Sequence, residues 1–192
     1  MSAHFVFFRR TLLLAGLLPG ILLPACSERA TFREMPLGLQ PETELTAQNG
    51  QREKLVSHLK QVNLLFFGYT RCPDFCPMTL HRLHSALGDN TEFKAKLTLL
   101  FISVDPKNDT PAELTRYLAA FPYAQGFTGS SEEIRRVEKL FGAYSKPENA
   151  SISHSLYLYV LNRKGRVIHL LRYDDPVEKL RLVLEQAAKG EQ

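Results

Sequence analysis

The chain has 192 residues, of which 44% are hydrophobic and 23% charged, as in soluble globular proteins, and its formal net charge is +4. This length suits one domain with a sizeable buried core. Residues 1–25 contain two arginines and no acidic residue, so the remainder holds 22 of the 24 basic residues against all 20 acidic ones. Basic and acidic residues are thus nearly equal in number and form no basic block, so the charge gives no reason to expect nucleic acid binding.

The first 25 residues are typical of an export signal. Arg9 and Arg10 precede an apolar run of about fifteen residues that closes on small side chains. This run is short for a bilayer span, which needs ~20 residues, so we expect a cleaved signal peptide of the lipoprotein type over residues 1–25, with an uncleaved N-terminal membrane anchor as the alternative. The sequence LLPAC, ending at Cys26, resembles the lipobox of bacterial lipoproteins, in which the cysteine becomes the lipid-bearing first residue.

These features predict an exported protein that is tethered to a membrane and faces the periplasm or extracytoplasmic space of a bacterium. Residues 26–41 are polar, contain two prolines and show little periodicity, which predicts a tether before a single domain over residues 42–190. If Cys26 carries a lipid, the mature chain keeps two thiols, Cys72 and Cys76. In an oxidising compartment an unprotected pair of thiols tends to become a disulfide.

Two continuous apolar runs predict strands that are buried on both faces. The first is VNLLFFGY, residues 62–69, and the second is KLTLLFISV, residues 96–104. Between them a helix is expected over residues 74–87, ended by Gly88. A strand, a helix and a second strand in this order predict a parallel pair joined by a right-handed crossover.

Three later helix starts share one capping chemistry. Residues 110–113 (TPAE) form a capping box with proline at the first helical position, and residues 130–133 (SSEE) repeat the box. Residues 175–178 (DPVE) combine an aspartate cap, a proline and a third-position glutamate. Between the last two helices, SLYLYVL and RVIHLLRY flank a turn at residues 162–165 that ends in glycine, which predicts a β-hairpin.

The predicted order is therefore strand, helix, strand, helix, helix, hairpin and helix. Two parallel strands, an antiparallel pair and covering helices make an α/β sandwich. This is the thioredoxin-like order with an extra helix between the two halves. We expect a single-domain α/β protein of thioredoxin-like fold, with a central mixed sheet and helices on both faces.

The two cysteines of TRCPDFCPM lie where a reactive sulfur is expected. Cys72 comes just after a predicted strand and Cys76 in the first turn of the next helix, where free N–H groups and the helix dipole stabilise a thiolate. On a helix, residues four apart have Cβ atoms ~5–6 Å apart. A disulfide requires ~3.5–4.5 Å, whereas two thiolates on one ion sit roughly 4 Å apart, sulfur to sulfur. The spacing favours a metal clamp and leaves a disulfide, redox-active or structural, possible.

Two thiolates are soft ligands that select copper(I) or zinc over calcium, magnesium or manganese. They are too few for a structural zinc site, so a further ligand must come from elsewhere, for example from the six histidines. His81 lies about 140° round the helix from Cys76, and His84 lies ~12 Å further along its axis, so both are expected on the helix surface. His154 ends an irregular loop before a strand, a junction that faces the cysteine corner in a thioredoxin-like fold. The residues alone leave it as a candidate ligand or a hydrogen-bonded structural residue.

Four segments stand in a recognisable order along the chain: FFGYTRCPDFCPMTL, FISVDPKNDTPAEL, FTGSSEEI and SISHSLYLYVLNRKG. Together they resemble the Sco/SenC family of copper-binding assembly proteins. In order and spacing the match covers roughly residues 42–185. The resemblance implies a membrane-tethered thioredoxin-like domain that binds copper, as copper(I), copper(II) or both, through Cys72, Cys76 and His154. Family members help insert copper into the binuclear copper site of cytochrome c oxidase, and some resemble thiol–disulfide reductases for the cysteines of that site.

One residue departs from the family pattern. The family often has an aspartate directly before the histidine, and here that residue is Ser153. A carboxylate beside a ligand can orient it or tune its basicity, so its absence could weaken copper(II) binding or change partner choice. Asp74, Asp105 and Asp109 are other acidic residues that could lie near the site, with Asp109 better explained by loop and cap chemistry.

Three main functions compete for this constellation, with a peroxidase as a lesser alternative. The first is a copper chaperone without catalytic turnover, which delivers copper to a cytochrome c oxidase subunit or another periplasmic copper protein. The alternative is a membrane-tethered thiol–disulfide oxidoreductase, with Cys72 attacking and Cys76 resolving, which keeps partner cysteines reduced. A peroxidase of the peroxiredoxin type shares the fold and Thr70-x-Cys72 but does not account for Cys76. A copper or redox sensor is a third possibility that the sequence does not separate from the chaperone.

Overall fold

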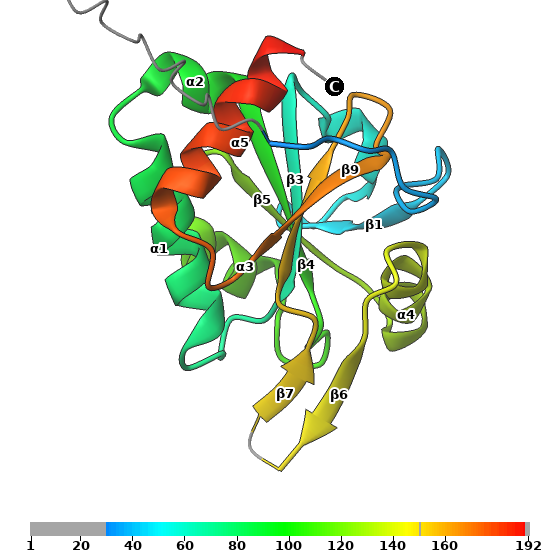
Figure 1. Ribbon diagram of the computed structural model, residues 1–192. Coiled ribbons are helices and arrows are strands. Elements are labelled where there is room, and N and C mark those ends of the chain that lie inside the picture. The colour runs from blue at the N-terminus through cyan, green and yellow to red at the C-terminus, as the bar shows by residue number, and fades with distance from the viewer. Residues whose placement is uncertain (1–29, 150, 191–192) are drawn as a thin grey trace, which may run out of the picture.

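A seven-stranded sheet forms the centre of the protein in the computed structural model, which describes residues 30–149 and 151–190 (Figure 1). Across the sheet the strands are β2 (Arg52–Lys54), β1 (Glu44–Ala47), β5 (Ala124–Thr128), β4 (Leu97–Ser103), β3 (Val62–Gly68), β8 (Tyr157–Leu161) and β9 (Val167–Arg172). A separate two-stranded sheet consists of β6 (Ser145–Glu148) and β7 (Ser151–His154).

Strands β3 and β4 lie in the middle of the sheet because both are apolar along their length. All seven residues of each strand are buried, and the two strands pair in parallel, with Phe66 opposite Phe101. β5 pairs in parallel with β4, while β8 pairs antiparallel with β3 and β9 antiparallel with β8. The two buried strands and the late hairpin predicted from the sequence are thus confirmed, and the carboxyl end of β3 leads directly into the cysteine loop.

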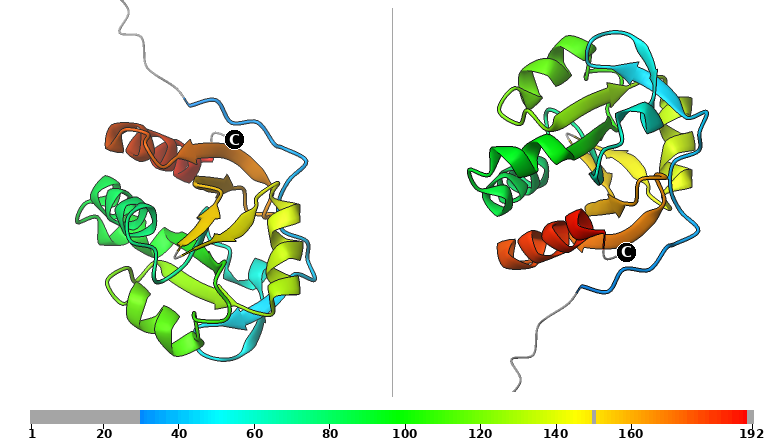
Figure 2. Two further views of the ribbon diagram at one scale, coloured as in Figure 1. Left: turned by 90° about the horizontal axis from the view of Figure 1, so that it is seen from below. Right: turned by 90° about the horizontal axis from the view of Figure 1, so that it is seen from above.

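Helices cover both faces of the sheet, as predicted. The helices are α1 (Phe75–Leu87), α2 (Thr91–Lys96), α3 (Pro111–Leu118), α4 (Ser131–Leu140) and α5 (Val177–Lys189), and a single 3-10 turn, η1, spans Leu55–His58. α1 and α5 pack side by side on one face, and α4 lies on the opposite face (Figure 2). α3 packs on β5, and its Tyr117 contacts Phe101 of β4 with ring centroids 5.7 Å apart.

The predicted helix starts are confirmed at two of three positions. The Ser130 hydroxyl accepts from the N–H of Glu133 (3.2 Å), and the Glu133 carboxylate accepts from the N–H of Ser130 (2.7 Å), which completes a capping box. Thr110 caps α3 through its hydroxyl, which accepts from the N–H of Glu113, and Pro111 is the first helical residue; the second bond of the predicted box is absent, because the Glu113 carboxylate pairs with Arg116 instead. The predicted Asp175 cap is wrong: Pro176 is the N-cap of α5, and the Asp175 carboxylate accepts instead from the end of β9 and from a lysine side chain of α5.

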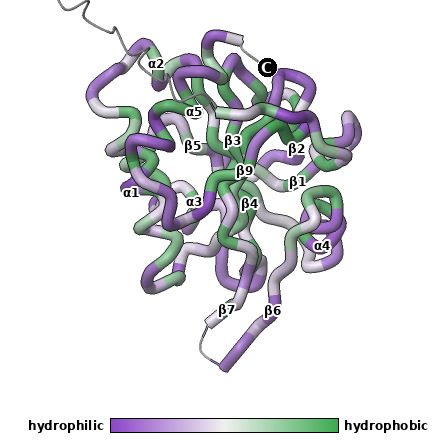
Figure 3. Tube along the Cα trace, viewed as in Figure 1, coloured by the Kyte–Doolittle hydropathy of each residue, from purple (hydrophilic) through white to green (hydrophobic). Residues whose placement is uncertain are grey.

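The sequence did not predict β5, the β1–β2 hairpin or the β6–β7 hairpin. β5 (AQGFT) is short and contains a glutamine and a glycine, so it lacks the apolar run that marks β3 and β4. A tertiary contact explains the glycine, because a Cβ at Gly126 would lie 2.9 Å from the Cβ of Leu114. β6 contains a proline and is largely exposed, so its sequence also lacks the features that predict a strand. Figure 3 shows the contrast between the hydrophobic central strands and hydrophilic β6.

The described chain is ordered before residue 42. Arg33 and Met35 donate backbone hydrogen bonds to Ile168 and Val167 of β9, and Leu39 is buried. Residues 33–39, inside the segment predicted as a tether, therefore lie against β9. The predicted signal peptide or anchor over residues 1–25 and the lipidation site Cys26 lie outside the described residues. Among the described residues, every helix is too short or too polar to cross a membrane.

Candidate metal centre

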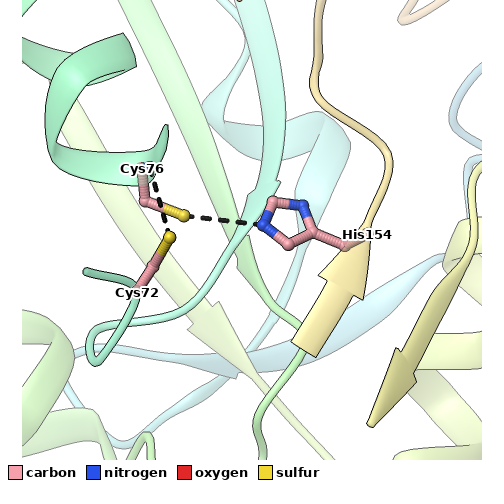
Figure 4. A group of neighbouring side chains, drawn as sticks. All are labelled: Cys72, Cys76 and His154. Atoms are coloured by element: carbon pink, nitrogen blue, oxygen red, sulfur yellow. Dashed lines mark hydrogen bonds between the residues drawn. The ribbon is translucent and has the colours of Figure 1, made fainter. Parts of the chain in front are cut away.

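Three residues from three separate segments meet at one end of the sheet. Cys72 lies in the loop after β3, Cys76 in the first turn of α1, and His154 at the last position of β7. Their two sulfurs and a ring nitrogen all lie within 4.8 Å of one another (Figure 4). The two cysteines are free thiols. The structure thus brings together the three residues that the family resemblance selected.

The cysteine loop is shaped by local backbone hydrogen bonds. The N–H of Cys72 donates to the carbonyl of Tyr69 (3.2 Å), which turns the chain back at the end of β3. The N–H of Cys76 points at the Cys72 sulfur, 3.4 Å away, so an unpaired donor of the helix N-terminus stabilises negative charge there. The Cys76 sulfur lies 3.7 Å from Nε2 of His154.

The two cysteines differ in their exposure to solvent. Cys76 is fully buried beneath the first turn of α1, whereas Cys72 is 8% and His154 6% exposed. Cys72 and His154 line a cleft of about 330 Å³ between the cysteine loop and the β6–β7 hairpin, together with Asp74, Phe75 and Ser153 among others. A ligand approaching from solvent therefore reaches Cys72 and His154 first.

The same arrangement gives the two thiols different pKa values, so that one is ionised and the other is not. Hydrogen bonding from the Cys76 side chain, aided by the N–H groups of Cys76 and Asp74, lowers the pKa of Cys72 from 9.0 to about 3 against the opposing effect of burial. The pKa of Cys76 is raised, first because its proton is held by the Cys72 sulfur and then because it is buried. At neutral pH the pair thus consists of a Cys72 thiolate and a Cys76 thiol, with one proton to release before both sulfurs bind an ion as thiolates.

A backbone carbonyl fixes the tautomer of His154. Nδ1 lies 3.0 Å from the carbonyl oxygen of Ser155, which only accepts, so Nδ1 carries the proton and Nε2 presents its lone pair to the sulfurs. The ring is also held edge-on against Phe66 and Tyr69, with centroids 6.2 and 5.8 Å away. The Ser155 carbonyl orients the imidazole from its far side, as a carbonyl or carboxylate does for histidine ligands of metals.

Asp109 anchors the loop that precedes Cys72. This carboxylate is fully buried and accepts from the N–H (3.1 Å) and hydroxyl (2.7 Å) of Thr70 and from the hydroxyl of Ser103 (2.6 Å). The sequence assigned Asp109 to loop chemistry, which is confirmed. Asp105 pairs with Arg71 at 2.9 Å on the outside of the same loop. Neither carboxylate belongs to the metal-ligand cluster of the described residues.

The other histidines of the described chain lie away from the cysteines. His81 and His84 contact Phe121 with ring centroids 5.6 and 5.8 Å apart, so both lie away from the cysteines as predicted; His81 is exposed, whereas His84 is half-buried rather than on the open helix surface. His58 pairs with a glutamate, and His169 lies on β9 against the carbonyl of Thr31. His154 is therefore the one histidine that the described part of the chain offers to the cysteines.

Sequence reasoning missed two residues that touch this centre. Tyr69 packs on His154 and accepts a hydrogen bond from the N–H of Ile152 (3.2 Å). Ser155 holds Nδ1 of His154 through its carbonyl and accepts from the N–H of Tyr144 through its hydroxyl (3.1 Å). Their adjacency to Cys72 and His154 in the sequence was the available signal, but only the fold shows which contacts they make.

Two thiolates and an imidazole form a donor set that suits soft and borderline ions such as copper and zinc. The model of the SCO1/SenC family matches residues 36–189. The chain belongs to the SCO1/SenC family.

The SCO1/SenC chain is 32% identical over 133 residues to the human mitochondrial SCO1 homolog, covering 65% of this chain and 44% of the human protein. It is 34% identical over 146 residues to the mitochondrial SCO2 homolog of Danio rerio, covering 71% of this chain and 52% of that protein. The chain thus spans about half the length of these relatives.

Solved structures of the family share the fold. Arabidopsis thaliana ScoI with copper bound superposes with a TM-score of 0.71 at 26% identity, covering 81% of this chain and 99% of that one. Bradyrhizobium japonicum ScoI with copper bound gives a TM-score of 0.62 at 31% identity, covering 80% and 98%. The thioredoxin-like fold predicted for this SCO1/SenC protein is thereby confirmed.

Proposed function

We propose that this protein is a copper chaperone that binds one copper ion through Cys72, Cys76 and His154. The observation that carries this function is the convergence of two sulfurs and a correctly oriented Nε2 within 4.8 Å. Thiolates favour copper(I), and imidazole also suits copper(II), so the set serves both oxidation states. Copper is bound in the similar structures of Arabidopsis thaliana and Bradyrhizobium japonicum ScoI, which supports the choice of metal.

The number of ligands favours copper over structural zinc. A structural zinc ion takes four protein ligands in a closed tetrahedral site. The described residues supply three, and the cluster contains no fourth histidine, cysteine, aspartate or glutamate. Three ligands reached through a cleft leave a coordination position for an atom of an incoming protein, which ligand exchange requires.

The surface around the cleft suits a protein partner. Phe75, Tyr144 and Tyr157 are among the large hydrophobic side chains that remain exposed in the described chain, at 41%, 56% and 43%. Phe75 lines the cleft beside Cys72, and the two tyrosines line the neighbouring hollow beside His154. Exposed aromatic residues are enriched where proteins bind each other. The recipient under this proposal is the copper-receiving subunit of cytochrome c oxidase or another periplasmic copper protein.

Membrane attachment belongs to the same proposal. The apolar run before LLPAC supports export and lipidation at Cys26, so the copper domain works on the periplasmic or extracytoplasmic side of a bacterial membrane. Replacing Cys26 by serine should move the protein from the membrane to the soluble fraction of the producing cell. A Cys26→Ser variant that stays membrane-bound would show that the N-terminal segment is an uncleaved anchor.

Anaerobic copper titration tests the binding function. The wild type should bind one copper per chain, with a thiolate-to-copper charge-transfer band for copper(II) and with chelator competition reporting copper(I). Cys72→Ala, Cys76→Ala and His154→Ala should each weaken binding, whereas His81→Ala, on the outer side of α1, should bind as the wild type does. Full copper affinity in His154→Ala would remove the third ligand, and absence of binding in the wild type would end the chaperone function.

A thiol–disulfide reductase is the second candidate, favoured by the low pKa of Cys72 beside a protonated Cys76. The Cys72 thiolate attacks a partner disulfide and releases one partner thiolate. Cys76, once deprotonated, attacks the Cys72 sulfur of the mixed disulfide and releases the second, so the partner is reduced as Cys72–Cys76 is oxidised. Reduction that persists in His154→Ala and in the presence of a copper chelator would favour this activity.

A further inference from the structure

The β6–β7 hairpin carries His154 but is only lightly attached to the rest of the domain. Its two strands form their own sheet and project beyond the end of the central sheet (Figure 1). All four residues of β6 and the first three of β7 are exposed or half-buried, and only His154 is buried. The distance between His154 and the cysteines thus depends on what holds this hairpin.

Tyr69 provides a link from the body of the domain to that hairpin. It follows β3 directly and is 4% exposed. Its hydroxyl accepts from the N–H of Ile152, two residues before His154, at 3.2 Å. Apart from the bond between His154 and the carbonyl of Ser155, the next residue in the chain, this bond and the 3.7 Å contact between Cys76 and His154 are the hydrogen bonds that join the two hairpin strands to the body within the described residues. The Tyr69 ring also lies edge-on to His154, at 5.8 Å and 84°.

The same tyrosine is connected to the cysteines. Its carbonyl accepts from the N–H of Cys72 at 3.2 Å, which shapes the cysteine loop. Its side chain lines the cleft together with Cys72 and His154. Burial raises the pKa of the Tyr69 hydroxyl, and the neighbouring Cys72 thiolate adds to this rise, so the hydroxyl keeps its proton while accepting from Ile152.

We propose that Tyr69 is the positioning residue for His154: its hydroxyl fastens the hairpin to the cysteine loop and thereby sets how fast copper(II) leaves the site. This role rests on the proposed copper-binding function and adds a residue outside the ligand set. The link is a single neutral hydrogen bond, so opening it is easy, and a partner that displaces Ile152 from Tyr69 frees His154 while both cysteines keep the ion. Two thiolates satisfy copper(I), so its retention depends less on Tyr69.

The test uses the full-length protein as wild type, Tyr69→Phe and a control, Tyr123→Phe. Tyr123 is also buried, at 3% exposure, but its hydroxyl has no partner among the described residues. Phenylalanine at residue 69 keeps the ring contact with His154 and removes the hydroxyl, both as the acceptor for the Ile152 N–H and as a neighbour of the Cys72 sulfur. Copper(II) release to a chelator and amide exchange of Ile152, followed by NMR in the metal-free protein, should both become about two- to tenfold faster in Tyr69→Phe alone. The charge-transfer band should persist, because both sulfurs still bind.

A second variant removes the other half of the bond. Ile152→Pro deletes the donor N–H. That N–H points to Tyr69, and the residue paired with Ile152 across the hairpin is itself a proline, Pro147. The variant should therefore give the same faster copper(II) release with Tyr69 intact. Unchanged Ile152 exchange in Tyr69→Phe, or unchanged copper(II) release in either variant, would overturn the proposal. Absence of copper binding in the wild type would instead overturn the proposed function and the effect on release with it, while the exchange data would still decide whether the link exists.

Discussion

Replacement of Asp109 should loosen the loop that carries Cys72. The fully buried carboxylate accepts three hydrogen bonds, two from Thr70 and one from Ser103. Asp109→Ala leaves the Thr70 N–H and both hydroxyls without their acceptor, next to the fully buried Ser103. Thr70 lies two residues before Cys72, so the loss reaches the metal centre as well as the fold.

The magnitude follows from the bonds. Hydrogen bonds to charged groups contribute about 1.5–3 kcal/mol each, and the cost of burying the carboxylate offsets part of their sum, so Asp109→Ala should cost about 3–5 kcal/mol. Asp109→Asn should cost less, about 1–2 kcal/mol, because its amide oxygen can replace Oδ2 and accept from the Thr70 N–H and the Ser103 hydroxyl. Its NH₂ group can donate to the Thr70 hydroxyl once that hydroxyl rotates.

Urea unfolding of the metal-free protein under reducing conditions measures these costs. Asp174→Ala is the matched control, because Asp174 pairs with Arg172 at 2.9 Å on the surface and should change the unfolding midpoint little. Copper titration of the same variants should show weaker binding in Asp109→Ala than in Asp109→Asn. The reasoning is refuted if Asp109→Ala costs less than about 1 kcal/mol, or if the alanine and asparagine variants are equally destabilised.

Three further predictions concern the cysteine charge, a helix cap and the packing of β5. Iodoacetamide should alkylate Cys72 before Cys76 in the metal-free protein. The rate should be nearly constant from pH 5 to 8, because the pKa of about 3 keeps Cys72 ionised until the pH falls toward that value. A rate that rises tenfold per pH unit in this range would contradict the assigned charge. Ser130→Ala should destabilise the protein by about 1 kcal/mol in urea unfolding through loss of the α4 capping box, and an unchanged midpoint would contradict this. Gly126→Ala should cost about 1–3 kcal/mol in the same assay, because its Cβ would lie 2.9 Å from Leu114; a variant as stable as the wild type would show that α3 can move aside.

Much of the fold could be predicted because its central elements carry strong local signals. The apolar runs of β3 and β4 are typical of strands buried on both faces, and Ser130 with Glu133 marks the start of α4. β5 and the β6–β7 hairpin escaped because their sequences are short, polar or interrupted by glycine and proline. Pairing with β4 stabilises β5, and such a contact across the sheet is not a property of its own five residues.

The metal centre, too, could be predicted from the sequence only in part. The cysteine spacing and its place at a strand-to-helix corner predicted a reactive or metal-binding pair, and helical geometry correctly excluded His81 and His84 as further ligands. His154, seventy-eight residues after Cys76, needed the resemblance to the family, because it approaches only through the folding of the hairpin. Tyr69 was not found, since its role depends on a hydrogen bond to a backbone group eighty-three residues away.

X-ray absorption spectroscopy of the copper-loaded protein tests the central claim most directly, because it counts the atoms bound to the metal. The account predicts two sulfur neighbours and one nitrogen with the outer scattering of an imidazole ring, which disappears in His154→Ala and persists in His81→Ala. A metal surrounded by oxygen or nitrogen alone, or an imidazole signal that survives in His154→Ala, would contradict it.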